Sequence, residues 1–159
     1  MRIFRIVGAI LVAVSGFLGA YILNSRAKSA IAQIDGLIML VRHIKNEIEC
    51  FCVPIPTAFA RCSCEIYERC GLRGEGAPTD ADSFFAACAI TDSQAKEQMR
   101  RFWGSLGRGY RDEQVSLCDL CVSALEARRR ELVSQLPSKI KVNSSLCVCS
   151  SLLVVILLL

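Results

Sequence analysis

Hydrophobic and polar positions divide this chain of 159 residues into three parts. One uncharged apolar run occupies Ile6–Leu23, and a second occupies Val142–Leu159. The segment between them holds all 15 acidic residues and all but two of the 19 Lys and Arg residues. Apolar residues in this middle segment recur every three or four positions, which is typical of amphipathic helices. The pattern therefore predicts a charged helical domain between two hydrophobic segments.

Both apolar runs are close to the length that a membrane-spanning helix requires. A hydrocarbon core takes roughly 20 apolar residues in a helix, and about 17 at the least. The first run reaches that length if Ile3 and Phe4 join it while Arg5 extends toward the headgroups. The second ends in an unbroken series of Leu, Val and Ile over Leu152–Leu159. We therefore expect transmembrane helices at residues 1–25 and 142–159, with a domain at residues 26–141 between them.

Each apolar run also has an alternative interpretation. With Arg2 and Arg5 before it, the first resembles a cleaved signal peptide, although it is longer than usual and cations at Arg26 and Lys28 disfavour cleavage there. The second also fits a buried core helix or the removable tail of a lipid-anchor signal. If both runs are anchors, the positive-inside rule places the middle domain in the cytoplasm. The basic residues on the domain side are Arg26, Lys28, Arg42, Arg128, Arg129, Arg130, Lys139 and Lys141, against Arg2 and Arg5 on the other.

The middle domain is predicted to begin with a long amphipathic helix that continues from the first apolar run. Its apolar stripe comprises Ile31, Ile34, Leu37, Ile38, Val41, Ile44 and Ile48. Pro54 and Pro56 end it, because proline lacks a backbone donor and disfavours helix in the residue before it. A second helix is expected from Pro56 to about Cys70, with Gly71 as its stop. The glycine-rich residues 71–78 predict a loop.

Three more helices complete the prediction. They are Asp80–Ala89, Thr91–Leu106 and Arg111–Leu136. Thr91 and Gln94 fit a capping box that begins the second of these helices, and glycines between positions 104 and 109 end it. Pro137 is expected to close the last helix, whose apolar face comprises Val115, Cys118, Val122, Leu125 and Leu132. Since no segment alternates like a β-strand, the predicted class is all-α, a small helical bundle flanked by two transmembrane helices.

The ten cysteines allow three interpretations. A disulfide framework requires an oxidising compartment, which conflicts with a cytoplasmic domain. The spacings Cys118-x-x-Cys121, Cys50-x-Cys52 and Cys62-x-Cys64 suggest zinc, but helical Cys-x-Cys thiols point to nearly opposite sides. The simplest interpretation is that cysteine serves as a small hydrophobic residue in a helical core. We expect neither a metal site nor a cofactor.

Catalytic patterns are not evident in the sequence. The one histidine, His43, is expected to be partly exposed on the first long helix. The stretch Gly71–Gly76 lacks the Lys-Ser/Thr of a phosphate-binding loop, and no nucleophile elbow stands out. We therefore predict that the protein is not an enzyme. Arginines near Phe102 and Trp103 make a weak case for nucleic acid, whereas a net charge of +4 beside a membrane favours anionic lipid headgroups.

Two motifs and the order of the elements resemble a known family. One motif is Glu47–Glu49 followed by the proline-rich Val53–Phe59, between two predicted helices. The other is Leu106–Gln114, which reads Leu-Gly-x-Gly-x-x-Asp-x-Gln, with Tyr110 at a position that is typically Asp. With one apolar segment before these motifs and one after them, the chain resembles the stage III sporulation protein AB family.

The resemblance implies a non-enzymatic membrane scaffold of the complex that joins mother cell and forespore. It implies a cytoplasmic helical bundle, similar to that of the platform protein of type II secretion and type IV pilus machines, on the mother-cell membrane that faces the forespore. The implied partners are a co-encoded secretion-type ATPase and other membrane proteins of the complex, with homo-oligomers as a further expectation. Candidate docking residues for the ATPase or for lipid are charged side chains that we expect to be exposed, namely Glu47, Glu49, Arg100, Arg101, Arg128, Arg129 and Arg130.

Two other functional classes stay open at this point. One is a secreted cysteine-rich disulfide domain with a cleaved signal peptide, which an intact N-terminus on the mature protein would exclude. The other is a zinc-binding membrane module, which stoichiometric zinc in the purified protein would support.

Overall fold

The computed structural model contains six helices and no β-strand among the residues that it describes. It describes the backbone at residues 2–51, 53–72, 78 and 81–158, and within these ranges not the side chains of residues 2–13, 16, 17, 81, 139, 143, 144, 148 and 151–158. The helices are α1 (Arg2–Phe51), α2 (Ile55–Ala60), α3 (Cys64–Cys70), α4 (Ala81–Ala87), α5 (Ser93–Ser105) and α6 (Arg111–Leu158). The predicted all-α class is confirmed.

The chain divides into two compact units. The core unit is Ala30–Leu132, and the terminal unit comprises Met1–Ser29 with Val133–Leu159. The apolar runs 6–23 and 142–159 belong to the terminal unit, and most of their side chains lie outside the described residues. Within the part of the chain that is described, no helix combines the length and the apolar character that a bilayer crossing requires. The predicted membrane boundaries at residues 25 and 141 stay predictions.

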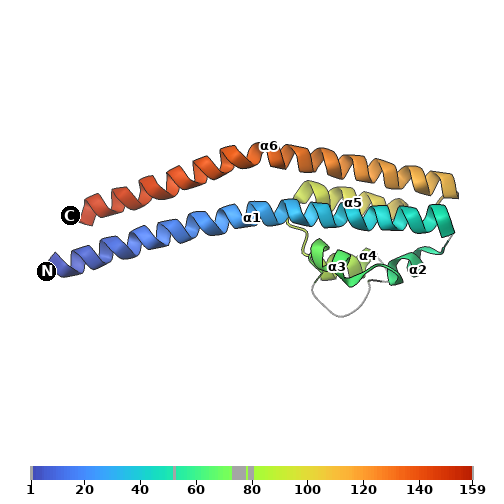
Figure 1. Ribbon diagram of the computed structural model, residues 1–159, viewed down its shortest axis with the longest axis horizontal. Helices are drawn as coiled ribbons and strands as arrows, with labels where there is room; N and C mark the ends of the chain where they lie inside the picture. Colours follow the sequence, from blue (N-terminus) through green and yellow to red (C-terminus); the bar gives the residue numbers. More distant parts are fainter. Residues whose placement is uncertain (1, 52, 73–77, 79–80, 159) are drawn as a thin grey trace. The chain divides into compact units, whose positions relative to one another are not determined.

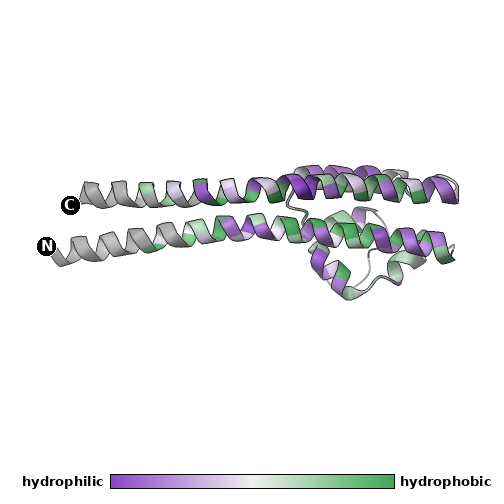
Figure 2. Ribbon diagram, turned by 45° about the horizontal axis from the view of Figure 1, so that its top comes forward, coloured by the Kyte–Doolittle hydropathy of each residue, from purple (hydrophilic) through white to green (hydrophobic). Residues whose placement is uncertain are grey.

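The apolar stripe of α1 forms the centre of the core unit. All of the predicted stripe residues are buried except Ile31, which is half-buried. In the core unit, α6 runs beside α1, and α2, α3 and α4 lie on the other side of α1 (Figure 1). Hydrophilic and hydrophobic residues alternate along α1 and α6 there (Figure 2), as expected for helices with one buried face. The predicted apolar face of α6 also packs inward, with Cys118 and Leu125 fully buried.

An aromatic cluster joins the short helices to α5. The ring of Trp103 stacks on Phe59 of α2 with 4.4 Å between centroids, and it lies 5.3 Å from Phe84 of α4. Phe102 and Met99, also on α5, are buried beside it. Large stacked rings contribute packing energy beyond their buried area, so this cluster anchors α2, α4 and α5 in one core.

Gln33 on α1 holds three segments of backbone together. Its side-chain Nε2 donates hydrogen bonds to the carbonyl oxygens of Cys70, at 2.8 Å, and Ala89, at 2.9 Å. Its Oε1 accepts a hydrogen bond from the backbone N–H of Thr91 at 2.9 Å. A buried amide is tolerated when its donors and acceptors find partners, as they do here. Gln33 thereby fixes the end of α3 and the segment before α5 on α1.

Gly36 lies one turn farther along α1, where α3 comes closest. A Cβ atom at position 36 would be 2.5 Å from the carbonyl carbon of Arg69 and 2.7 Å from the nitrogen of Cys70. Only glycine accommodates backbone at that distance. Gly71 then ends α3 with a left-handed φ of 85°, the usual role of glycine after a helix.

Two predicted helix boundaries are wrong. The helix expected from Pro56 to Cys70 is interrupted between Ala60 and Cys64, where Ser63 is extended and Cys62 is buried. The break lets the Tyr67 hydroxyl donate a 2.6 Å hydrogen bond to the Phe59 carbonyl oxygen at the end of α2. The expected closure at Pro137 is also wrong, because α6 continues to Leu158. Pro137 is exposed, so water can satisfy the carbonyl that loses its donor.

The predicted capping residue of α5 is off by one position. The helix begins at Ser93, and the side chain of Asp92 rather than Thr91 accepts a hydrogen bond from the Ala95 N–H at 2.9 Å. Aspartate is among the preferred residues at this position. Asp92 is also held by Arg128 of α6, so one carboxylate serves a helix end and an ion pair.

Candidate functional site

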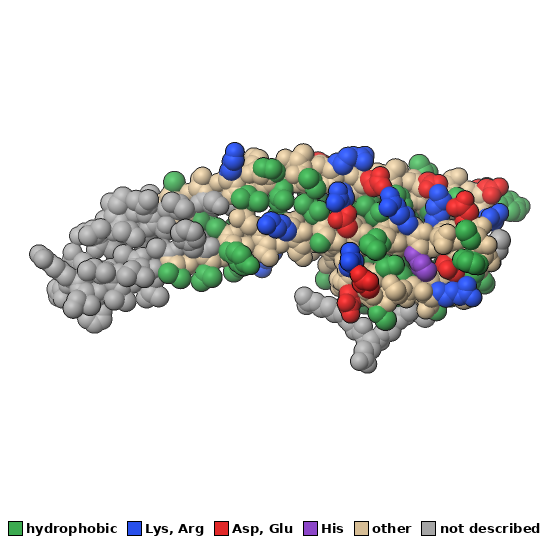
Figure 3. All heavy atoms as spheres, in the orientation of Figure 1, with side chains coloured by type: hydrophobic (Ala, Val, Ile, Leu, Met, Phe, Trp, Pro, Cys, Tyr) green, Lys and Arg blue, Asp and Glu red, His purple; other side chains and the backbone are tan. Residues whose placement is uncertain are grey.

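The candidate docking residues divide into exposed and structurally engaged groups. Glu49, Arg100, Arg101 and Arg130 are exposed. Arg101 forms an ion pair with Glu97 one turn earlier, and the Arg100 guanidinium lies 5.9 Å from the centre of the Phe85 ring. On the face in Figure 3, basic side chains alternate with acidic ones over the core unit. These four residues are therefore accessible to a partner, and their docking role stays a prediction.

Glu47 is not exposed, so that expectation is wrong. Its side chain retains only 9% of its accessible surface, and its Oε2 pairs with Nη1 of Arg61 at 3.2 Å. Glu47 lies on the face of α1 that packs against the region of α2, and its pairing with Arg61 stabilises the turn after α2. The carboxylate therefore has a structural role in the core unit.

The three successive arginines of α6 have different surroundings. Arg128 retains 17% of its side-chain surface and pairs with Asp92 at 2.8 Å and with Glu131 at 2.7 Å. Arg129 pairs with Asp35 of α1. Arg130 is 70% exposed, and it forms an ion pair with Glu126 of the same helix, at 3.8 Å. The expectation of one exposed basic cluster is wrong, because Arg128 and Arg129 tie α6 to the rest of the core unit.

Asp92 has a pKa below its ordinary value. Burial by itself raises the pKa of this carboxyl, but hydrogen bonds from Arg128 and from the N–H of Ala95 stabilise the charged form and outweigh burial. Hydrogen bonds to the carboxylates of Asp92 and Glu131 in turn raise the pKa of Arg128. The pair is therefore ionised at neutral pH and fastens the start of α5 to the middle of α6.

The break between α5 and α6 is held by side chains of the second motif. Gly107 has a left-handed φ of 82°, and its N–H donates to Oε1 of Gln114 at 2.8 Å. Glu113 Oε2 accepts from the N–H of Tyr110 at 3.1 Å, which is the half of a capping box made by the third helical residue. The motif thus has a structural function, and Tyr110 itself is 85% exposed.

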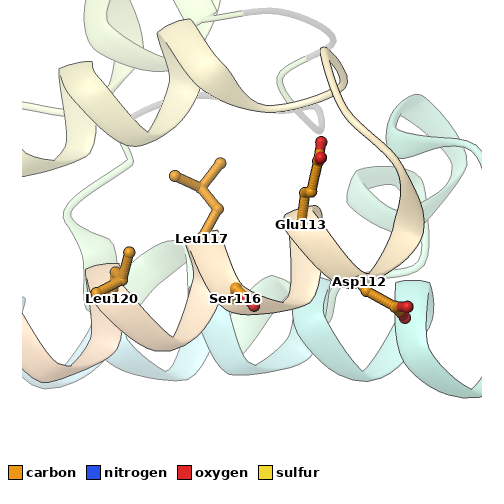
Figure 4. Close-up of a pocket in the computed structure, with 5 residues that line it drawn as sticks. All are labelled: Asp112, Glu113, Ser116, Leu117 and Leu120. Atoms are coloured by element: carbon orange, nitrogen blue, oxygen red, sulfur yellow. The ribbon is translucent and has the colours of Figure 1, made fainter.

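An apolar groove between α5 and α6 was not predicted from the sequence. Figure 4 shows Leu117 and Leu120 of α6 on the same side of the helix, facing the space next to α5. Leu120 is 68% exposed, and Leu117 is half-buried. The groove between the two helices is lined by Gln98, Arg101, Phe102, Ser105, Leu117, Leu120 and Cys121. A second, shallow pocket on α6 shares the two leucines and is lined by Asp112, Glu113, Ser116, Leu117 and Leu120. The sequence shows leucines at positions 117 and 120, but it does not show that they lie outside the buried face of α6.

The cysteines that the structure describes are free thiols. Five of them, Cys62, Cys70, Cys88, Cys118 and Cys121, are buried in the core, where they pack as small hydrophobic residues. The described residues contain no group of three or more His, Cys, Asp or Glu side chains placed to hold a metal ion. His43 is half-buried, and its Nε2 lies 3.2 Å from the carbonyl oxygen of Ala58, to which that nitrogen donates when it is protonated.

The buried thiols should react far more slowly than the exposed ones. Burial raises the pKa of Cys62, Cys88 and Cys118 to about 11 and that of Cys121 to about 12. Because the thiolate is the reactive form, a thiol reagent at about pH 8 should modify Cys50 and Cys64 in the native protein first. Mass spectrometry of the labelled peptides measures the order. Labelling of Cys121 as fast as Cys64 without denaturant would contradict the burial of Cys121 in the core.

Comparison with known proteins identifies one family. The sequence model described as stage III sporulation protein AB matches residues 86–159, which include the Leu106–Gln114 motif and all of α5 and α6. No match is found among curated proteins, and none is found among solved structures. The resemblance predicted from the motifs is thus confirmed over residues 86–159, the part of the chain that matches the stage III sporulation protein AB family.

Proposed function

We propose that this protein is a non-catalytic scaffold of the sporulation complex that links mother cell and forespore. Its core unit docks a secretion-type ATPase in the mother-cell cytoplasm, and hydrolysis takes place on that partner. The observation that carries the proposal is the family match over residues 86–159. Within the core unit those residues supply α5 and the part of α6 up to Leu132, which carry most of the exposed candidate docking residues.

Membrane anchoring is supported by the side chains of the terminal unit. Several large apolar residues there are exposed, among them Leu18 at 56%, Tyr21 at 74% and Leu146 at 63%. Such an apolar surface suits a lipid environment. Arg26 and Lys141 are exposed farther along the same helices, where cations favour contact with anionic headgroups. In this proposal the terminal unit lies in the mother-cell membrane that faces the forespore, beside the other membrane proteins of the complex.

Docking of the ATPase is proposed to use the exposed arginines of α5. Charges at the rim of an interface mainly affect the association rate and its salt dependence. Substitution of such exposed charges changes the free energy of unfolding little. Arg100 and Arg101 meet that description, because both are exposed and neither contributes to the buried core. Glu49 and Arg130 are further exposed charges that a partner can contact.

Reversal of both charges in an Arg100→Glu, Arg101→Glu variant tests this function. We expect recovery of the ATPase with the full-length protein, purified from membranes at physiological salt, to fall at least about threefold. Lys96→Glu, at an exposed position on the same helix, is the matched control and should retain recovery. Equal recovery with a folded double variant would overturn docking through these arginines. Failure of the unaltered protein to recover any ATPase would overturn the proposed function itself.

A further inference from the structure

We draw no further inference here: the strongest candidate, the apolar groove between α5 and α6 that is lined by Phe102, Leu117, Leu120 and Cys121, carries none, because nothing in the structure shows what covers it.

Discussion

Replacement of Gly36 by alanine is expected to destabilise the core unit by about 3 kcal/mol or more. The added methyl group would lie 2.5 Å from the Arg69 carbonyl carbon and 2.7 Å from both the Arg69 oxygen and the Cys70 nitrogen. All three atoms belong to backbone, so no side-chain rotation relieves the contact. Separation of α1 from α3 would also stretch the hydrogen bond from Gln33 to Cys70, which lies one turn away. The local overlap therefore spreads to the segments that Gln33 holds.

Gly104→Ala is the matched control, and it should act in the opposite direction. Gly104 lies near the end of α5, and a Cβ there would meet no atom within 4 Å. Alanine is favoured over glycine in a helix by about 0.5–1 kcal/mol, so this variant should be slightly more stable. Denaturant unfolding followed by fluorescence measures both, because Trp103 is the sole tryptophan and is buried. Equal midpoints for the two variants would contradict the close approach of α3 to Gly36.

Hydrophobic spacing was sufficient to predict the main helices. The α1 stripe from Ile34 to Ile48 is buried as expected, because its period of three to four residues has only one stable arrangement against a core. The break at Arg61–Ser63 was missed, since none of these residues is a strong helix breaker. It is set by tertiary contacts, above all the hydrogen bond from Tyr67 to Phe59. At Pro137 the opposite error occurred: a helix end was predicted, but α6 continues, because an exposed proline can be accommodated within a long helix.

The exposure of charged residues was harder to predict from the sequence than the burial of apolar ones. The sequence does not distinguish the three consecutive arginines Arg128, Arg129 and Arg130 from one another. In a helix, however, successive side chains differ by about 100° in direction. One therefore meets Asp92, one meets Asp35, and one faces solvent. Likewise Glu47 and Glu49 share a short motif, but only Glu49 is exposed. Which charge is available to a partner depends on the placement of α5 and α1 against α6, and no local pattern encodes that placement.

Arginines that pair with other helices cannot be reversed in charge without disturbing the core unit. A reversal of all three arginines of α6 would remove two interhelical ion pairs along with one exposed charge. Loss of partner binding would then report a damaged core unit rather than a docking contact. Arg130 separates the two effects, since it shares the helix and the charge of Arg128 but retains 70% of its side-chain surface.

Removal of the Arg128 charge is the second large effect that we expect. The Asp92 side chain is 10% exposed in the unaltered protein. In Arg128→Leu this carboxylate loses its principal partner, which should destabilise the core unit by about 3 kcal/mol. Arg130→Leu is the control and should change stability by no more than about 0.5 kcal/mol. Urea unfolding near neutral pH, again followed by the fluorescence of Trp103, compares them. Similar values for the two variants would show that the Asp92–Arg128 pair is not buried as described.

The pH dependence of this effect has a definite sign. Because the folded protein lowers the pKa of Asp92, the unfolded chain binds a proton more readily than the folded one. The stabilisation by the pair is therefore complete above the ordinary carboxyl pKa of about 4 and is lost as the pH falls through the lower, folded value.

Asp92→Asn retains a side chain that caps α5 but carries no charge. Its stability deficit should be constant from about pH 7 to pH 5 and should shrink below about pH 4. A deficit that grows on acidification would mean that burial, rather than Arg128, dominates the ionisation of Asp92.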